Sequence, residues 1–329
     1  MIFRYLRKRM NPVVHNADRG DLAPSTGDPA GDRLWQALAR RDPRSARDIF
    51  EEVSDPDDLA FYVNVCADVP GMRKWVGEWS KMQPDWAVPL LVKGVCGIRW
   101  ALQAWEPSGG RFFRYLRRLE TAEDCFTAVV TRDPDNTTAW SYLVGTSFRR
   151  ELPLAETRRR FAEAVARHPL HLHAHDEMLR GLSPRWGGNE EEMFDFARAT
   201  VATAPPGSPL GRLVARAHLE HWFGERMPDG YLKRPDVLAE LRAAADRSVR
   251  DPTYRRRPGW PITDNLFAYV FVMAEDYTAA RELFGMIGDL VTAYPWSHHG
   301  DPVTAYPWHH HGDPVAVFDQ MRALACADG

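Results

Sequence analysis

The densest group of potential metal ligands lies in the segment HPLHLHAHDEM, at residues 168 to 178. If this segment is helical, His171 and His175 stand four positions apart on one face, a geometry that zinc accepts. The zincin pattern requires Glu directly after the first of these histidines, and Leu172 stands there instead. The pair therefore indicates either a metal site or two packed rings, and packing explains His175 without a metal.

A second pair, His218 and His221, lies three positions apart in the segment ARAHLEHWF. On a helix these two rings face one way. Together with His171 and His175 they would complete a four-histidine site if the fold brings the pairs together, and the chain would then be a metal-dependent enzyme or a metal sensor. The alternative is an amphipathic helix with histidines at its boundary. We favour that alternative and expect no cofactor.

Twelve residues near the C-terminus occur twice in succession, as VTAYPWSHHGDP at 291–302 and VTAYPWHHHGDP at 303–314. Only one position differs, as in a recent in-frame duplication. The histidines of the two copies would give weak binding of a soft divalent metal. Because one copy suffices to join two helices, we interpret the second as a duplicated loop without a selected role.

The folded region contains a basic run, Arg255, Arg256 and Arg257, close to Trp260 in the sequence YRRRPGW. Such a run can contact an acidic partner or a nucleic-acid backbone, and its alternative is a solvated loop. Trp186, in SPRWGGNEEEM, precedes two glycines and the start of a helix, where an anion can bind. Three glutamates in the first turn oppose an anion, so we expect a capped helix start there.

The composition argues against several classes of protein. The formal net charge is −3 and the pI is near 6.5, so no overall field favours nucleic acid. No run of about 18 uncharged apolar residues predicts a membrane span, and basic residues interrupt the N-terminal segment MIFRYLRKRM, unlike a signal peptide. The four cysteines are far apart, which favours the cytoplasm. We find neither glycine-rich nucleotide motifs nor a GxSxG elbow, so no enzyme class is predicted.

From residue 33 onward, apolar residues recur at spacings of three and four, which predicts helices. No alternation of apolar and polar residues typical of strands stands out. The segment AEDCFTAVVTRDP recurs 35 residues later as TRRRFAEAVARHP, with an aromatic, a small or aliphatic residue and a proline at matching places. Each proline is followed six residues on by a ring, Trp140 or His175. The related triplets elsewhere are Ala46, Phe50 and Val53, and Ala280, Phe284 and Ile287.

This pattern resembles tetratricopeptide repeats over residues 118 to 180, and in part at 33 to 55 and 262 to 290. The chain also resembles a bacterial family of uncharacterised repeat-like proteins. The resemblance implies an all-α fold, an α-solenoid of stacked antiparallel helical hairpins with no substantial β-sheet. It also implies a concave groove that binds a protein or peptide. The Lys, Arg and Asn set that clamps a terminal carboxylate in well-known members is not found in register here.

We therefore predict a flexible tail and linker at 1–32, a repeat domain at 33–290, the duplicated His-rich loop at 291–314 and a C-terminal helix at 315–329. The expected function is that of a non-catalytic scaffold or adaptor that binds a protein or peptide in the cytoplasm. Neither a membrane nor nucleic acid is expected as a partner, and the oligomeric state stays open. The candidate groove residues are Trp140, His175, Trp186, Arg255, Arg256, Arg257 and Trp260.

Overall fold

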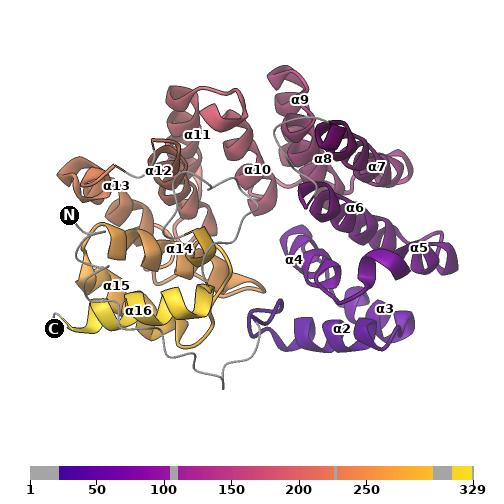
Figure 1. Ribbon diagram of the computed structural model, residues 1–329, viewed down its shortest axis with the longest axis horizontal. Helices are drawn as coiled ribbons and strands as arrows, with labels where there is room; N and C mark the ends of the chain where they lie inside the picture. The colour runs from indigo at the N-terminus through magenta and orange to yellow at the C-terminus, as the bar shows by residue number, and fades with distance from the viewer. Residues whose placement is uncertain (1–21, 104–109, 226–227, 299–312, 328–329) are drawn as a thin grey trace. The chain divides into compact units, whose positions relative to one another are not determined.

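The computed structural model describes residues 22–103, 110–225, 228–298 and 313–327 (Figure 1). Every regular element in these ranges is a helix, and none of these residues lies in a β-strand. The all-α fold is therefore confirmed for the described residues. The chain forms two compact units. We call residues 27–200 with 256–259 the amino-terminal unit, and residues 1–26, 201–255 and 260–329 the carboxy-terminal unit.

The amino-terminal unit is built from consecutive helices joined by short turns. Its elements are α2 (Pro29–Ala39), α3 (Pro43–Glu51), α4 (Pro56–Ala67), α5 (Met72–Met82), α6 (Ala87–Leu102), α7 (Gly110–Arg132), α8 (Thr137–Arg149), α9 (Leu154–Arg167), α10 (Leu172–Leu182), η1 (Pro184–Trp186) and α11 (Glu190–Thr203), whose last residues belong to the carboxy-terminal unit.

The first three of these helices each begin at an Asp-Pro pair. Asp28, Asp42 and Asp55 are the N-caps, and their carboxylates accept hydrogen bonds from amides of the first turn. The proline that follows each cap occupies the first helical position, where its missing N–H costs nothing. As a result α2 begins at Pro29, inside the segment that we predicted as a linker.

The helices of the amino-terminal unit pack in an alternating order. α6 packs against α5 and α7, α8 packs against α7 and α9, and α10 packs against both α8 and α9. In addition, α4, α6, α8 and α10 are successive neighbours (Figure 1). Consecutive helical hairpins have this order, in which each helix also contacts its counterpart in the next hairpin.

Small residues allow α6 and α7 to approach each other closely. A Cβ atom added at Gly94 would lie 2.5 Å from the ring of Phe126, and one added at Gly97 would lie 2.9 Å from the Cβ of Ala122. Phe126 is fully buried and stacks on Tyr142, with 4.9 Å between the ring centroids. The small residue and the ring of the repeat pattern thus lie in helix interfaces.

α8 is the most enclosed helix of this unit. Each of its residues from Thr137 to Arg149 is buried except Trp140, which is half-buried. Its two serine hydroxyls are satisfied within the helix, because Ser141 donates to the carbonyl of Thr138 at 2.7 Å and Ser147 to that of Val144 at 2.7 Å. Hydrogen bonding within the helix explains how a polar helix can be a core element.

One helix of this unit, α4, packs against helices far from it in the chain. α4 packs not only against α6 but also against α8 and α10. The hydroxyl of Tyr142 donates to the carbonyl of Ala60 at 3.2 Å, and Asn64 Nδ2 donates to that hydroxyl at 2.8 Å. At the start of α10, the amide of Leu172 donates to Asp57 Oδ1 at 2.8 Å. The inner side of α8 is therefore occupied by the chain itself.

The carboxy-terminal unit surrounds one apolar helix. Its described elements are η2 (Pro209–Gly211), α12 (Arg212–Gly224), η3 (Tyr231–Lys233), α13 (Pro235–Asp246), α14 (Trp260–Met273), α15 (Tyr277–Ile287), η4 (Trp296–His298) and α16 (Pro314–Ala327). α14 contacts α12, α13, α15 and α16, and its residues from Thr263 to Val272 are all buried. The predicted triplet Ala280, Phe284 and Ile287 is buried on α15.

The first copy of the duplicated segment contributes a core residue to this unit. Trp296 is fully buried, and its Nε1 donates to Asn265 Oδ1 at 2.6 Å. Its ring lies 5.2 Å from that of Phe318 in an edge-on arrangement. The first copy therefore helps to hold α16 against the unit. Residues 299–312, which include His299 and the histidines of the second copy, lie outside the described residues, and the last residue of that copy, Pro314, begins α16.

Candidate partner-binding surface

The first histidine pair organises the start of α10. His171 is the N-cap, and its Nδ1 accepts a hydrogen bond from the amide of Ala174 at 3.2 Å. His175 Nδ1 lies 2.9 Å from the carbonyl oxygen of His171, and its ring packs on Phe161 and Phe196 at 5.0 and 5.9 Å. Burial lowers the pKa of both histidines. Both residues thus serve a buried helix start, and His175 is not on an exposed groove.

The second pair lies in the carboxy-terminal unit, on α12. His218 Nδ1 lies 2.8 Å from the hydroxyl of Tyr231, and its Nε2 lies 3.2 Å from Glu240 Oε2. The ring of His221 lies 4.4 Å from that of Tyr231. The two pairs of the four-histidine metal site, which we considered as the alternative to packed histidines, thus lie in different units, and within each unit the pair has its own packed surroundings.

A different set of residues comes closest to a metal-binding arrangement. Asp55, Asp57 and His168 offer ligand atoms within 4.8 Å of one another, and they form the one such group among the described residues. Asp55 Oδ2 is already 2.7 Å from Arg257 Nη2, and Asp57 Oδ1 accepts the amide of Leu172. The carboxylates are therefore satisfied within the protein, and the group joins α4 to the turn before α10. Sequence spacing missed it because more than 110 residues separate its parts.

The predicted basic run is divided between the units and partly neutralised. Arg257 Nη2 contacts both Asp55 and Asp58, at 2.7 and 2.9 Å. Arg255 is exposed and donates to the backbone carbonyls of Pro252 and Tyr254, and Arg256 is also exposed. Trp260 is half-buried at the first position of α14. Of this run, Arg257 serves the fold through its ion pairs.

The two predicted tryptophans of the amino-terminal unit are packed on one side. Trp140 Nε1 donates to the carbonyl of Pro134 at 2.8 Å, and the guanidinium groups of Arg159 and Arg167 lie over its ring at 5.9 and 5.6 Å. Trp186 packs edge-on against Phe148, with 5.0 Å between centroids. Both rings are half-buried, so each keeps some exposed surface.

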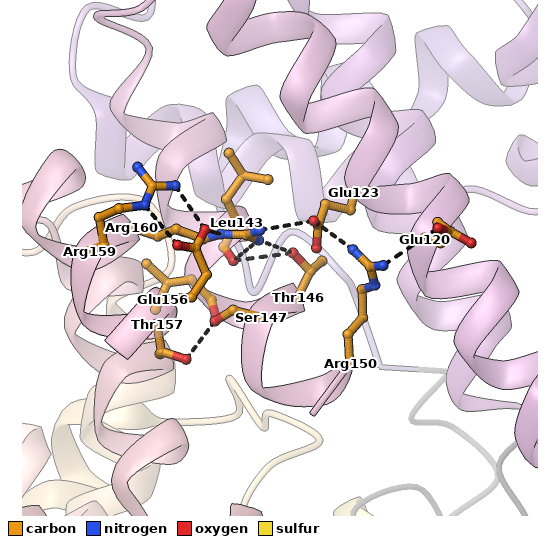
Figure 2. Close-up of polar contacts among 11 residues, drawn as sticks. Glu120, Glu123, Leu143, Thr146, Ser147, Arg150, Glu156, Thr157, Arg159 and Arg160 are labelled. Atoms are coloured by element: carbon orange, nitrogen blue, oxygen red, sulfur yellow. Dashed lines mark hydrogen bonds and ion pairs between the residues drawn. The ribbon is translucent and has the colours of Figure 1, made fainter. Parts of the chain in front are cut away.

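Arginines inside the amino-terminal unit form a network with carboxylates, shown in Figure 2. Glu123 Oε1 accepts from Arg150 at 2.7 Å and from Arg160 at 2.9 Å. Glu156 accepts from Arg160 at 2.7 Å and from Arg159 at 2.8 Å (Figure 2). Hydrogen bonds from Arg159 and then Arg160 outweigh burial and lower the pKa of Glu156 to about 2. These charges link α7, α8 and α9.

A second, more deeply buried ion pair joins α8 to α10. Arg149 and Glu177 are 5% and 7% exposed, and Arg149 Nη2 donates to Glu177 Oε1 at 3.3 Å. Arg180 contacts the same Glu177 oxygen at 3.1 Å. Burial raises the pKa of Glu177, but Arg149 and Arg180 outweigh it and hold that pKa well below its usual range. The carboxylate therefore stays ionised in the interior.

One group of arginines differs from all of these. The guanidinium carbons of Arg118 on α7 and Arg73 on α5 lie 3.8 and 4.8 Å from the ring centroid of Trp100 on α6. Arg118 Nη1 donates to the carbonyl of Trp100 at 2.8 Å, and its buried Nε has no hydrogen-bond partner. Burial, and then the charges of Arg114 and Arg73, lower the pKa of Arg118. We call Arg73, Trp100, Arg114 and Arg118 the arginine–tryptophan cluster.

No carboxylate of the described residues forms an ion pair with Arg73, Arg114 or Arg118. Our sequence analysis missed this cluster and singled out residues 255 to 257 instead. A signal was present, because the segment RFFRYLRR at 111–118 contains four arginines and no acidic residue. The contribution of Arg73 and Trp100 was not visible, since they lie on other helices.

No family model, curated protein or solved structure matches this chain. Within the described ranges, no helix combines the length and hydrophobicity that a bilayer span requires.

Proposed function

We propose that the protein is a non-catalytic scaffold or adaptor, an α-solenoid of tetratricopeptide-like hairpins that binds a protein or peptide partner in the cytoplasm. The observation that carries this proposal is the alternating packing order of α5 to α10 in the amino-terminal unit. Stacked hairpins of this kind present extended surfaces, and partner binding is their common use.

The outer surface of the amino-terminal unit is the better candidate for the contact. The inner side of α8 is covered by α4, as the bonds from Tyr142 to Ala60 and from Asn64 to Tyr142 show. Among the described residues, the large apolar side chains with high exposure are Met82, Phe113 and Leu170, at 55%, 71% and 39%. All three belong to the amino-terminal unit. Exposed apolar groups next to polar surface favour protein contacts.

A metal-dependent function has less support. His171 and His175 direct their Nδ1 atoms to the backbone of α10, and the Asp55, Asp57 and His168 group already contains an arginine counter-charge from Arg257. These side chains have structural partners, so packing accounts for them.

Site-specific photo-crosslinking tests the proposal. A benzophenone amino acid is placed at Met82, Phe113 or Leu170 of the full chain in its native cells, with exposed Ala239 of α13 as the matched control position. We expect at least one of the three positions to form an ultraviolet-dependent adduct with one recurrent protein, identified by mass spectrometry. That protein should then bind the purified chain in calorimetry. If none of the three positions yields an adduct beyond the level at Ala239, the proposal is wrong.

A further inference from the structure

The arginine–tryptophan cluster carries positive charge that no carboxylate of the described residues neutralises. We propose that this cluster, with the neighbouring exposed Phe113, binds an acidic linear segment of the partner protein. The inference rests on the proposed function and adds the place of contact and the chemistry of the partner.

Arg118 lies among like charges, and no described carboxylate pairs with it. Elsewhere in the unit, buried or half-buried arginines such as Arg149, Arg150 and Arg160 each contact a glutamate. Arg118 is half-buried as well, yet its neighbours are Arg73, Arg114 and the ring of Trp100. Partial burial of like charges is unfavourable. A carboxylate of a partner protein would therefore bind more favourably there than beside an arginine that already has an acidic partner.

The guanidinium groups of Arg73 and Arg118 are already held in place by the protein. Trp100 attracts the guanidinium groups of Arg73 and Arg118 through its π-system, at 4.8 and 3.8 Å. The hydrogen bond from Arg118 Nη1 to the carbonyl of Trp100 further restricts the orientation of the Arg118 guanidinium group. A planar guanidinium that is already held in place loses less freedom when it pairs with a carboxylate, which leaves more of the interaction for binding.

An exposed apolar side chain, Phe113, lies next to the arginines of the cluster. Phe113 is 71% exposed and lies on α7 beside Arg114, while Arg117 is exposed one turn further along. On a helix, positions 113, 114, 117 and 118 occupy one broad face. An aromatic ring next to arginines is a typical anchor in protein interfaces. The surface therefore fits a segment in which acidic residues flank an apolar side chain.

Nucleic acid fits this surface less well. Arg73 and Arg118 already lie over the ring of Trp100, so a base that stacks where they lie would have to displace a guanidinium group. The net charge of the whole chain is −3, which opposes long-range attraction of a polyanion. A short acidic peptide avoids that repulsion because its contact stays local.

Peptide display on the purified full chain tests the inference. Random twelve-residue peptides are selected on the wild type and on the double variant Arg73→Gln/Arg118→Gln. The matched control is Arg44→Gln/Arg47→Gln, which removes two exposed arginines from α3. We expect the wild type and the control to enrich peptides with several Asp or Glu residues around an apolar residue. The double variant should lose that enrichment while its far-ultraviolet circular dichroism stays unchanged.

A labelled synthetic copy of the most enriched acidic peptide then gives affinities by fluorescence anisotropy. We expect the double variant to bind about tenfold or more weakly, which corresponds to the loss of at least one charge contact. The affinity of the Arg118→Lys variant should lie between those of the wild type and the double variant, because lysine keeps the positive charge but lacks the planar guanidinium group. Phe113→Ser should weaken binding without changing its salt dependence.

Three outcomes would overturn the inference: no acidic enrichment on the wild type, equal affinity in the double variant, or tighter binding of a single-stranded oligonucleotide than of the peptide. Its failure is distinct from failure of the proposed function. If photo-crosslinks form at Met82 or Leu170 but not at Phe113, the chain binds a partner through another face.

Discussion

The two halves of α7 use arginine chemistry in opposite ways. In its carboxy-terminal half, Glu123 accepts hydrogen bonds from Arg150 and Arg160 of the neighbouring helices (Figure 2). In its amino-terminal half, Arg114 and Arg118 meet Arg73 and Trp100, and no described carboxylate pairs with them. The same residue type thus joins helices where an acid lies nearby and forms a cationic surface where none of the described carboxylates pairs with it.

This contrast separates residues that stabilise the fold from residues free to act on a partner. A neutralised arginine has its strongest interaction within the chain, so its loss should appear in the free energy of unfolding. An arginine without an acidic partner contributes little to folding, so its loss should appear in binding.

The largest effect is expected at the buried pair between α8 and α10. Glu177→Gln leaves the cationic Arg149, which is 5% exposed, without its carboxylate. Removing one partner of a buried ion pair costs about 3–5 kcal/mol, because the remaining charge stays desolvated. Urea unfolding followed by circular dichroism should show a loss of this size in the free energy of unfolding.

Glu120→Gln is the matched control for that experiment. Glu120 is 60% exposed, and its Oε1 lies 3.6 Å from Arg150 Nη2 at the edge of the network in Figure 2. An exposed pair contributes less than about 1 kcal/mol. Equal losses for the two variants would remove the distinction between interior and surface arginine pairs.

The sequence allowed the prediction of the local parts of this architecture. Helical spacing and the 35-residue recurrence around Phe126 both report on patterns that are visible along the chain. Periodicity identifies which face of a helix is apolar. It does not identify the helix that the face meets, and this is why the packing of α4 against α8 and α10 was not predicted.

The candidate site was missed for the same reason. Arg73, Trp100 and Arg118 lie on three helices and are 18 or more residues apart, so no spacing rule connects them. The histidines drew attention because they are dense in sequence, yet His175 is 6% exposed and packs between aromatic rings. Density in sequence measures local composition, whereas exposure and charge pairing depend on the tertiary fold.

A smaller effect, dependent on pH, is expected where α4 meets α10. Burial lowers the pKa of His175 below its ordinary value of 6.5, so the unfolded chain binds the proton more tightly. The free energy of unfolding should therefore fall as the pH drops through 6.5 toward the folded pKa. In the His175→Phe variant, the free energy of unfolding in urea should depend less on pH between about 7.5 and 5.5, a range centred on the ordinary histidine pKa of roughly 6.5.

His168→Gln is the opposite test at the same junction. The Asp57 carboxylate, whose Oδ2 lies 3.7 Å from His168 Nε2, raises the pKa of His168, and Asp55, Arg257 and His171 also face the group. Its stabilising contribution is complete below the unfolded pKa and is lost as the pH rises through the higher folded pKa. This variant should thus lose more stability in acid than in base. The same pH dependence in both variants would contradict the assigned directions.

The smallest effect on stability is expected at the arginine–tryptophan cluster. Arg118→Gln removes the contact with the Trp100 ring and one hydrogen bond, but it also relieves repulsion from Arg73 and Arg114. These contributions oppose each other, so the free energy of unfolding should change by no more than about 0.5 kcal/mol, as at an ordinary surface position. Added salt offers an independent check, because it screens like-charge repulsion and should stabilise the wild type slightly more than the variant. A loss comparable to that of Glu177→Gln would mean that Arg118 has a structural counter-charge, and the two halves of α7 would then no longer differ.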